Sequence, residues 1–302
     1  MKIGYPCINW TVDCKSDRTF RLKSYSEKRL KETVENNLTC LAKILSYNLK
    51  RNILFFRITS DLIPFASHPV CTYNWPDEFK DQFISIGSYI KKNHIRISMH
   101  PDQFIVLNSP DPKIVKRSID ELKYHAQVLD LLNLNNTAKI QLHVGGVYKN
   151  KQKSLKRFVE NFEKLSTNIR DRLVIENGDK SYSIKDCLNL HNLTGMPILF
   201  DYYHHQMLNN REKLLDILSD VKKTWNKSDG ILMVDYSSQK PNERIGAHAE
   251  HIDIDDFSLF LSNTYPIDFD IMLEIKDKEK SAIKAVELLR NDIRFIQLGG
   301  LN

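Results

Sequence analysis

Acidic and imidazole side chains recur at the ends of short apolar runs along this 302-residue chain. Six such runs read IRISMH, KIQLHV, RLVIEN, PILFDYYHH, GILMVD and DIMLEIK, and each is rich in Ile, Leu and Val, as buried parallel strands are. Because the carboxyl ends of parallel strands meet at one face, this pattern predicts one polar site built from many strands. The residues at or just past the ends of these runs are His100, His143, Glu176, Asp201, Asp235 and Glu274.

Strand-like and helix-like runs alternate along the whole chain. Strand-like runs cover residues 2–8, 53–58, 95–100, 139–144, 172–177, 197–201, 230–235 and 270–275. Each precedes a run with helical character, at 26–50, 76–93, 111–134, 154–169, 183–193, 210–225, 255–263 and 279–291. Repeated βα units imply a parallel sheet, and polar residues come from nearly every strand end rather than from one switch point. We therefore predict a single (β/α)8 TIM-barrel domain over residues 1–302, with a metal site at the carboxyl ends of its strands.

Composition limits the partners and the compartment that the chain can have. The net charge is +6 and the sequence pI about 8.9, which a generic solvated surface and a polyanionic partner explain about equally well. No GxGxxG or GxxxxGK(S/T) motif is present, so no nucleotide cofactor is expected. The N-terminal segment has no long apolar core, and no apolar run approaches the ~20 residues of a membrane span. We expect a cytoplasmic protein without a secretory signal or a membrane partner.

The cysteines show neither a CxxC spacing nor an even number for a disulfide framework. They are expected to be reduced thiols of an intracellular protein. None joins the strand-end residues, so a thiolate zinc site is not expected. The five cysteines are Cys7, Cys14, Cys40, Cys71 and Cys187.

Histidines and carboxylates together suggest a metal centre. A single histidine at a strand end is more often a packing residue, but buried carboxylates at a barrel mouth are costly unless they are paired or metal-bound. So many candidate ligands predict two or three divalent ions, and mixed imidazole and carboxylate donors suit Mn2+, Zn2+ or Fe2+ better than Mg2+. The histidines in or beside loops that follow strands are His68, His100, His143, His204 and His248. The interleaved carboxylates are Glu176, Asp201, Asp235 and Glu274.

Clustered divalent ions suit phosphodiester hydrolysis, because they activate water and stabilise charge on phosphoryl and departing oxygens. Isomerisation or epimerisation of sugars is a competing chemistry on similar barrels, and it usually needs fewer ligands.

Motifs in order along almost the whole chain resemble the UV damage endonuclease family. They are GYPCIN, LIPFASHP, SMHPDQF, LHVGG, the D-x-x-HH step at 201–205, SSQKPNERIGAHAEHI and LEIKDKE. The resemblance implies a metal-dependent TIM-barrel repair enzyme, similar to endonuclease IV in fold and metal cluster. It implies nicking of damaged double-stranded DNA immediately 5′ to cyclobutane pyrimidine dimers or 6-4 photoproducts, leaving 3′-hydroxyl and 5′-phosphate ends. Flipping of the damaged dinucleotide and a secondary activity on abasic sites are also implied. A general abasic-site endonuclease and a damage-binding protein without catalysis are the alternatives to this interpretation.

The resemblance also assigns metal ligands, with Glu176 as a bridge between ions. Family members commonly carry Lys-x-His at the end of the seventh strand, where this chain reads Met233-Val234-Asp235. A carboxylate from Asp235 makes the ligand set harder and favours Mn2+ over Zn2+. The catalytic residues are predicted to be His68, His100, His143, Glu176 and Glu274. The metal ligands are predicted to be His68, His100, His143, Glu176, Asp201, His204, Asp235, His248 and Glu274.

Residues that contact the lesion follow from the same resemblance. Tyr5 and Asn9 are assigned to the lesion, and Gln103 and Phe104 to probing of the duplex. Phe104 is suited to wedge into a base stack, although Tyr5 and Phe104 can equally be read as plugs of the barrel mouth. Lysines in two loops on the same face are either phosphate contacts or solvated surface. They are Lys149, Lys151 and Lys153 in one loop, and Lys276, Lys278 and Lys280 in the other. A monomer that associates with the nucleoid through DNA binding is expected.

Overall fold

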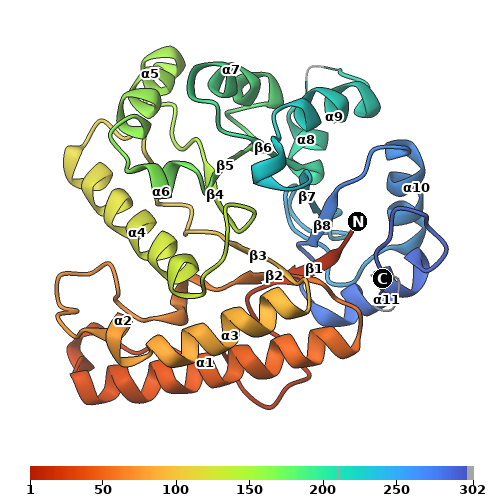
Figure 1. Cartoon of the computed structure of the whole chain (residues 1–302). Coiled ribbons are helices and arrows are strands. Elements are labelled where there is room, and N and C mark those ends of the chain that lie inside the picture. The colour runs from red at the N-terminus through yellow and green to blue at the C-terminus, as the bar shows by residue number, and fades with distance from the viewer. Residues whose placement is uncertain (210, 298–302) are drawn as a thin grey trace.

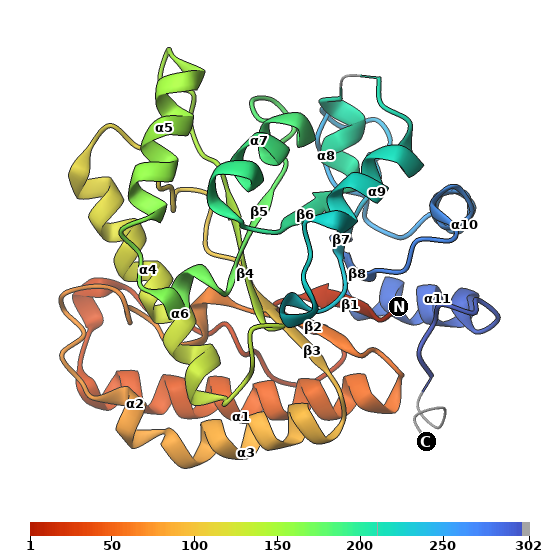
Figure 2. The same cartoon turned by 45° about the horizontal axis from the view of Figure 1, so that its top comes forward.

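The computed structural model describes residues 1–209 and 211–297. Eight parallel strands form a closed barrel in sequence order, because β1 pairs with both β2 and β8. The helices surround these strands in both views (Figures 1 and 2). The predicted TIM barrel is confirmed. The strands are β1 (Ile3–Pro6), β2 (Phe55–Ile58), β3 (Arg96–Met99), β4 (Lys139–His143), β5 (Leu173–Glu176), β6 (Ile198–Asp201), β7 (Met233–Tyr236) and β8 (Asp270–Leu273).

The helices bury apolar faces against the outside of the barrel. In α1, Leu30, Val34 and Leu38 recur at helical spacing and are buried, and the Ser26 side chain caps the first turn by accepting from Arg29 N. The helices are α1 (Glu27–Lys50), α2 (Trp75–Glu78), α3 (Lys80–Lys92), α4 (Pro112–Leu131), α5 (Lys151–Phe162), α6 (Thr167–Arg170), α7 (Ile184–Thr194), α8 (Tyr202–Met207), α9 (Leu214–Lys223), α10 (Ile254–Thr264) and α11 (Glu279–Leu289).

Three helical segments differ from the predicted ranges. The helix predicted over 76–93 is divided into α2 and α3 at Phe79, and the one predicted over 154–169 is divided into α5 and α6. The short helix α8 directly follows β6, in a stretch for which no helix was predicted. Asp201 starts it by accepting a hydrogen bond from His204 N, 2.7 Å away. This early helix turns His204 back toward its own strand end.

The barrel interior has three layers. Near the amino ends of the strands, Arg96 pairs with Asp270 at 2.9 Å and Lys139 pairs with Asp229 at 2.5 Å. An apolar layer follows, and it separates these charges from the carboxyl ends of the strands. The apolar layer consists of Phe55, Val174, Leu199, Met233 and Met272. Met233 is thus a barrel core residue that contributes no charge.

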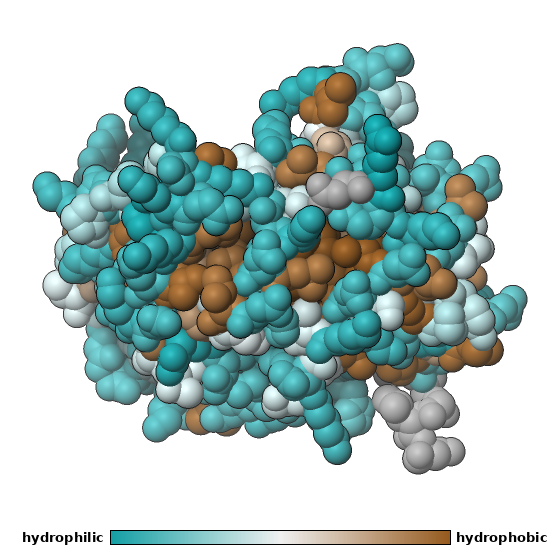
Figure 3. Space-filling view, turned by 90° about the horizontal axis from the view of Figure 1, so that it is seen from above, coloured by the Kyte–Doolittle hydropathy of each residue, from teal (hydrophilic) through white to brown (hydrophobic). Residues whose placement is uncertain are grey.

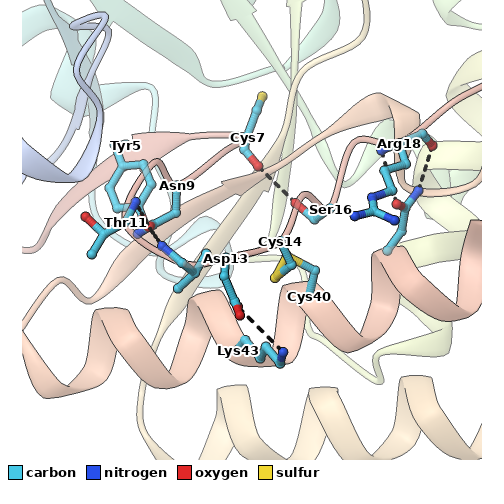
Figure 4. Close-up of a disulfide and its surroundings, with 12 residues drawn as sticks. Tyr5, Cys7, Asn9, Thr11, Asp13, Cys14, Ser16, Arg18, Cys40 and Lys43 are labelled. Atoms are coloured by element: carbon cyan, nitrogen blue, oxygen red, sulfur yellow. Dashed lines mark hydrogen bonds and ion pairs between the residues drawn. A yellow bond between two sulfur atoms is a disulfide. The ribbon is translucent and has the colours of Figure 1, made fainter.

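The loop after β1 is joined to α1 by a disulfide between Cys14 and Cys40 (Figure 4). Their Cα atoms lie 5.8 Å apart, an ordinary spacing for a disulfide. The prediction that all five cysteines are reduced is therefore wrong for this pair, whereas Cys7, Cys71 and Cys187 are free thiols. Residues 26 positions apart reveal no pairing in the sequence, because only the docking of the loop on α1 brings them together.

The outer surface carries the polar faces of the helices. On the side that includes α5, α7 and α9, hydrophilic residues predominate and hydrophobic residues are visible between them (Figure 3). Within residues 1–209 and 211–297, no helix combines the length and the apolarity needed to span a membrane.

Candidate metal centre and nucleic-acid interface

The strand ends bring most of the predicted ligands together. His143 and Glu176 are the last residues of β4 and β5 and lie opposite each other in register. Asp201, the last residue of β6, lies opposite Asp235 of β7 in the same way. His100 and Glu274 directly follow β3 and β8. The parallel register therefore converts distant sequence positions into one ring at the barrel mouth.

Glu176 is the centre of this ring. Its carboxylate is buried, with Oε2 3.3 Å from His100 Nε2 and 3.7 Å from His143 Nε2. Its Oε1 lies 3.3 Å from His204 Nδ1. Burial by itself raises the pKa of Glu176, but the imidazoles of His143, His100 and His204 outweigh it and hold the pKa well below the usual range. An ionised carboxylate among three imidazoles is a suitable bridge between two cations.

Neighbouring groups orient two of these imidazoles. His100 Nδ1 lies 2.6 Å from the carbonyl oxygen of Pro101, and its Nε2 faces Glu176. His204 Nδ1 is 3.1 Å from Asp201 Oδ2. Burial lowers the pKa of His204, but Asp201 and Glu176 raise it to about 10. Hydrogen bonds from the second ring nitrogen fix the tautomer and the direction of a ligating histidine, so His100 is held in a ligating orientation.

An arginine occupies the other side of the ring. Arg57 Nη2 lies 2.6 Å from Asp235 Oδ2, and Nη1 lies 2.5 Å from Glu274 Oε1. Gln141 Nε2 donates to Asp235 Oδ2 at 2.6 Å and to Glu176 Oε2 at 2.8 Å. Burial alone raises the pKa of Glu274, but the Arg57 guanidinium lowers it to about 2. Arg57 and Gln141 were not predicted from the sequence, although a charged or amide residue inside an apolar strand run is a usable signal.

The donor set fits divalent ions. The ring contains four carboxylates, of which Arg57 pairs with two, and one oxygen of Asp235 is buried without a hydrogen-bond partner among the described residues. Burial and the neighbouring carboxylates hold the pKa of Asp201 and of Asp235 well above the usual range. Divalent cations would remove this repulsion. Within the described chain, the groups with one ligand atom per residue within 4.8 Å of one another are His100–His143–Glu176, Glu176–Asp201–His204 and Asp201–Asp235–Glu274.

Two predicted ligands lie outside these groups. His68 is exposed in the loop after β2, where its Nδ1 accepts a hydrogen bond from Val70 N at 3.1 Å. His248 is closer to the ring, because its Nδ1 is 2.9 Å from the Glu274 carbonyl oxygen and 3.8 Å from Glu274 Oε2. The structure therefore does not bring His68 into the cluster and places His248 at its edge.

Tyr5, one of the two residues predicted to contact the lesion, is buried in this conformation. Tyr5 has no exposed surface, and its hydroxyl donates to Asn48 Oδ1 at 2.5 Å and accepts from Asn9 Nδ2 at 2.7 Å. Asn9 is also buried, and its Oδ1 accepts from the backbone of Thr11 and Val12 (Figure 4). These two residues pack and shape the loop after β1, and they present nothing to a bound duplex in this conformation.

Gln103 and Phe104 lie at the surface instead. Phe104 is 70% exposed, which excludes the alternative that it plugs the barrel. Both residues line a cavity of about 760 Å3 whose walls also include Glu176, and the facing loop contributes Ile245, which is 85% exposed. Ile245 was not predicted from the sequence, because an isolated apolar residue in a polar loop carries no periodic signal.

A second cavity, of about 610 Å3, lies on the Arg57 side of the ring. Gln103 and His248 line both cavities, so the two hollows share walls. Lys276 and Lys278 line the second one. The predicted loop location is wrong for three of the other lysines, because Lys151 and Lys153 lie in α5 and Lys280 lies in α11. Lys151 forms an ion pair with Asp186 at 2.6 Å, whereas Lys149, Lys153 and Lys280 are exposed.

Fold and donor set together define a (β/α)8 barrel with a candidate multi-ion centre at its mouth. The family model described as UV-endonuclease UvdE matches residues 1–299, and the chain belongs to this family. The UV DNA damage endonuclease of Clostridium perfringens (strain 13 / Type A) is 40% identical over 292 residues, which are 96% of this chain and 71% of that protein. The crystal structure of SacUVDE is 50% identical, with a TM-score of 0.92 over 96% of this chain and 98% of that one.

A more distant structure shares the fold alone. Endonuclease IV from Thermus thermophilus has a TM-score of 0.55 at 14% identity, over 82% of this chain and 94% of that one. The predicted family and the predicted likeness in fold are both confirmed.

Proposed function

We propose that this chain is a metal-dependent DNA repair endonuclease that nicks the phosphodiester bond immediately 5′ to UV photolesions. The observation that carries the proposal is the buried ring around Glu176 at the barrel mouth, in a chain of the UvdE family. The substrates are cyclobutane pyrimidine dimers and 6-4 photoproducts in duplex DNA, and the products carry 3′-hydroxyl and 5′-phosphate ends.

The residues around Glu176 would hold the ions, for which we propose Mn2+. When bound, divalent ions would lower the pKa of the attacking water and stabilise negative charge on the phosphoryl and leaving oxygens. The chain itself sets the geometry: Glu176 joins two donor groups, and Gln141 fixes its Oε2 at 2.8 Å. Arg57 holds Glu274 and Asp235 in fixed orientations. Mixed imidazole and carboxylate donors favour Mn2+ over Mg2+.

Damaged DNA is read by exposed side chains beside the ring. Crosslinked dipyrimidines stack and pair poorly, so extruding them costs less than extruding normal pairs. Phe104 would fill the space that the flipped dinucleotide leaves in the stack, and Gln103 would hydrogen-bond the orphaned bases. The cavity of about 760 Å3 beside Glu176 supports entry of the extruded dinucleotide there. Lys276 and Lys278, which line the second cavity, would contact backbone phosphates.

The test uses an end-labelled duplex with one site-specific cyclobutane dimer. We expect one cut directly 5′ of the dimer with protein and Mn2+, and no cut with chelator or on the undamaged duplex. Extension of the nicked strand by a DNA polymerase distinguishes a 3′-hydroxyl from a 3′-phosphate end. Absence of this cut, with cleavage of an abasic duplex by the same preparation, would reassign the chain to abasic-site repair. Size-exclusion chromatography with light scattering tests the predicted monomer.

A further inference from the structure

The Asp201–Asp235–Glu274 group differs from the other two donor groups in containing no imidazole. Two of its three carboxylates are also already paired, because Arg57 contacts Asp235 at 2.6 Å and Glu274 at 2.5 Å. Among the described residues, no lysine or arginine forms an ion pair with Glu176 or Asp201. The ring thus has one side, at Asp235 and Glu274, that is paired with the Arg57 cation, and another side, at Glu176 and Asp201, that is not.

Arg57 is built into the barrel and is not a flexible surface charge. It lies on β2, two residues after the buried Phe55, and its side chain is only 4% exposed. Its planar fork spans two carboxylates, a geometry that a guanidinium fits and an ammonium does not. Since arginine does not lose its proton in proteins, this positive charge is permanent.

Gln141 connects the two sides of the ring. Its Nε2 donates to Asp235 Oδ2 on the Arg57 side and to Glu176 Oε2 on the imidazole side. Asp235 Oδ2 therefore accepts from both Arg57 and Gln141, and its direction is fixed. A divalent ion bound between Asp235 and Glu274 would lie beside the guanidinium and would be repelled by it.

We propose that Arg57 acts as a resident cation that takes the place of one metal ion. The centre then binds two divalent ions, both at donor groups that share Glu176, and Arg57 supplies the positive charge at the third group. This inference rests on the proposed metal centre and specifies its stoichiometry. Asp235 becomes a positioning residue for Arg57 rather than a metal ligand, which revises the ligand set predicted from the sequence.

Counting bound ions tests the proposal without measuring nicking. Manganese per chain is measured by mass spectrometry of the metal-loaded protein after gel filtration, for the wild type, Asp235→Asn and His100→Ala. We expect two ions in the wild type, two in Asp235→Asn and one in His100→Ala. Loss of an ion in Asp235→Asn, or three ions in the wild type, would overturn the proposal. A wild type that retains no ion would remove the metal centre and the proposed function with it.

A second measurement needs no variant and so remains decisive if Asp235→Asn does not fold. Anomalous scattering from Mn2+-soaked crystals of the wild type should show two peaks, both within ligand distance of Glu176. A peak between Asp235 and Glu274 would contradict the resident-cation role of Arg57. The peaks are independent of DNA cleavage, so a failure of this inference can be told apart from a failure of the photolesion assignment.

Discussion

The two ends of the barrel interior carry charges in opposite ways. At the amino ends of the strands, Arg96 pairs with Asp270 and Lys139 pairs with Asp229, one cation for each carboxylate. At the carboxyl ends, Arg57 pairs with only two of the four carboxylates of the ring, and no other arginine or lysine among the described residues forms an ion pair with them. An apolar layer lies between the two ends.

This difference separates a structural arrangement from a functional one. Each of these pairs balances its own buried charges, so the amino end needs no added cation. An excess of buried carboxylates is unfavourable unless cations neutralise it, so the carboxyl end is suited to bind them. The comparison predicts that substitutions at the two ends have different consequences, for catalysis at one and for stability at the other.

The largest effect is expected from Glu176→Ala at the carboxyl end. Removing the shared carboxylate should reduce nicking of the dimer duplex by about 1,000-fold or more, because both proposed ion sites depend on it. Circular dichroism should show an intact fold. Glu287→Ala, which changes an exposed carboxylate on α11 outside the ring, is the matched control and should cut normally. Cleavage by Glu176→Ala near the wild-type rate would show that the ring is misassigned.

At the amino end, Asp270→Asn should act on stability instead. The variant leaves the buried Arg96 charge without its partner, which costs about 3–5 kcal/mol in the free energy of unfolding. Urea denaturation measures this loss, and nicking per folded molecule should stay within about twofold of the wild type. The double variant Arg96→Met/Asp270→Leu should recover part of the loss. Equal damage to activity and stability would remove the distinction between the two ends.

A titration experiment sharpens the comparison through His125, a buried imidazole outside the ring. Burial lowers its pKa from 6.5 to about 4, so the folded protein holds the neutral form. Between pH 6.5 and pH 4, His125 is protonated in the unfolded chain but neutral in the folded protein. The free energy of unfolding is therefore unaffected by His125 above pH 6.5 and decreases as the pH falls toward 4. The loss at pH 4 is about 3 kcal/mol. Urea denaturation of chelated wild type and His125→Gln should show a weaker pH dependence in the variant, and identical curves would contradict the assignment.

The smallest effect is expected at the exposed rim of the carboxyl end. Phe104→Ala with Gln103→Ala should reduce discrimination between damaged and undamaged duplex by about tenfold, since one stacking contact contributes ~1–3 kcal/mol. Bound manganese should be unchanged, because neither residue belongs to a donor group. Leu259→Ala, an exposed apolar residue on α10, is the control. Unchanged discrimination would return Phe104 and Gln103 to a surface role.

Local sequence patterns were sufficient to predict much of the fold and many residues of the candidate site. The alternation of strand-like and helix-like runs predicted the barrel, since the two periodicities depend only on neighbours along the chain. The same runs located His100, His143, Glu176 and Asp201, because a strand end in a parallel barrel has a known direction. The helix breaks near Phe79 and after 162 were not predicted, because helical spacing continues through them.

By itself, the sequence determined the order of the elements, the family, and which strand ends carry the candidate ligands. Only the tertiary structure decided which of these groups meet. It paired Arg57 with Asp235, buried Tyr5 against Asn48, joined Cys14 to Cys40 and left His68 outside the ring. The physical reason is that periodicity records the direction of a side chain on its own element, whereas a contact depends on how elements far apart in the sequence pack together.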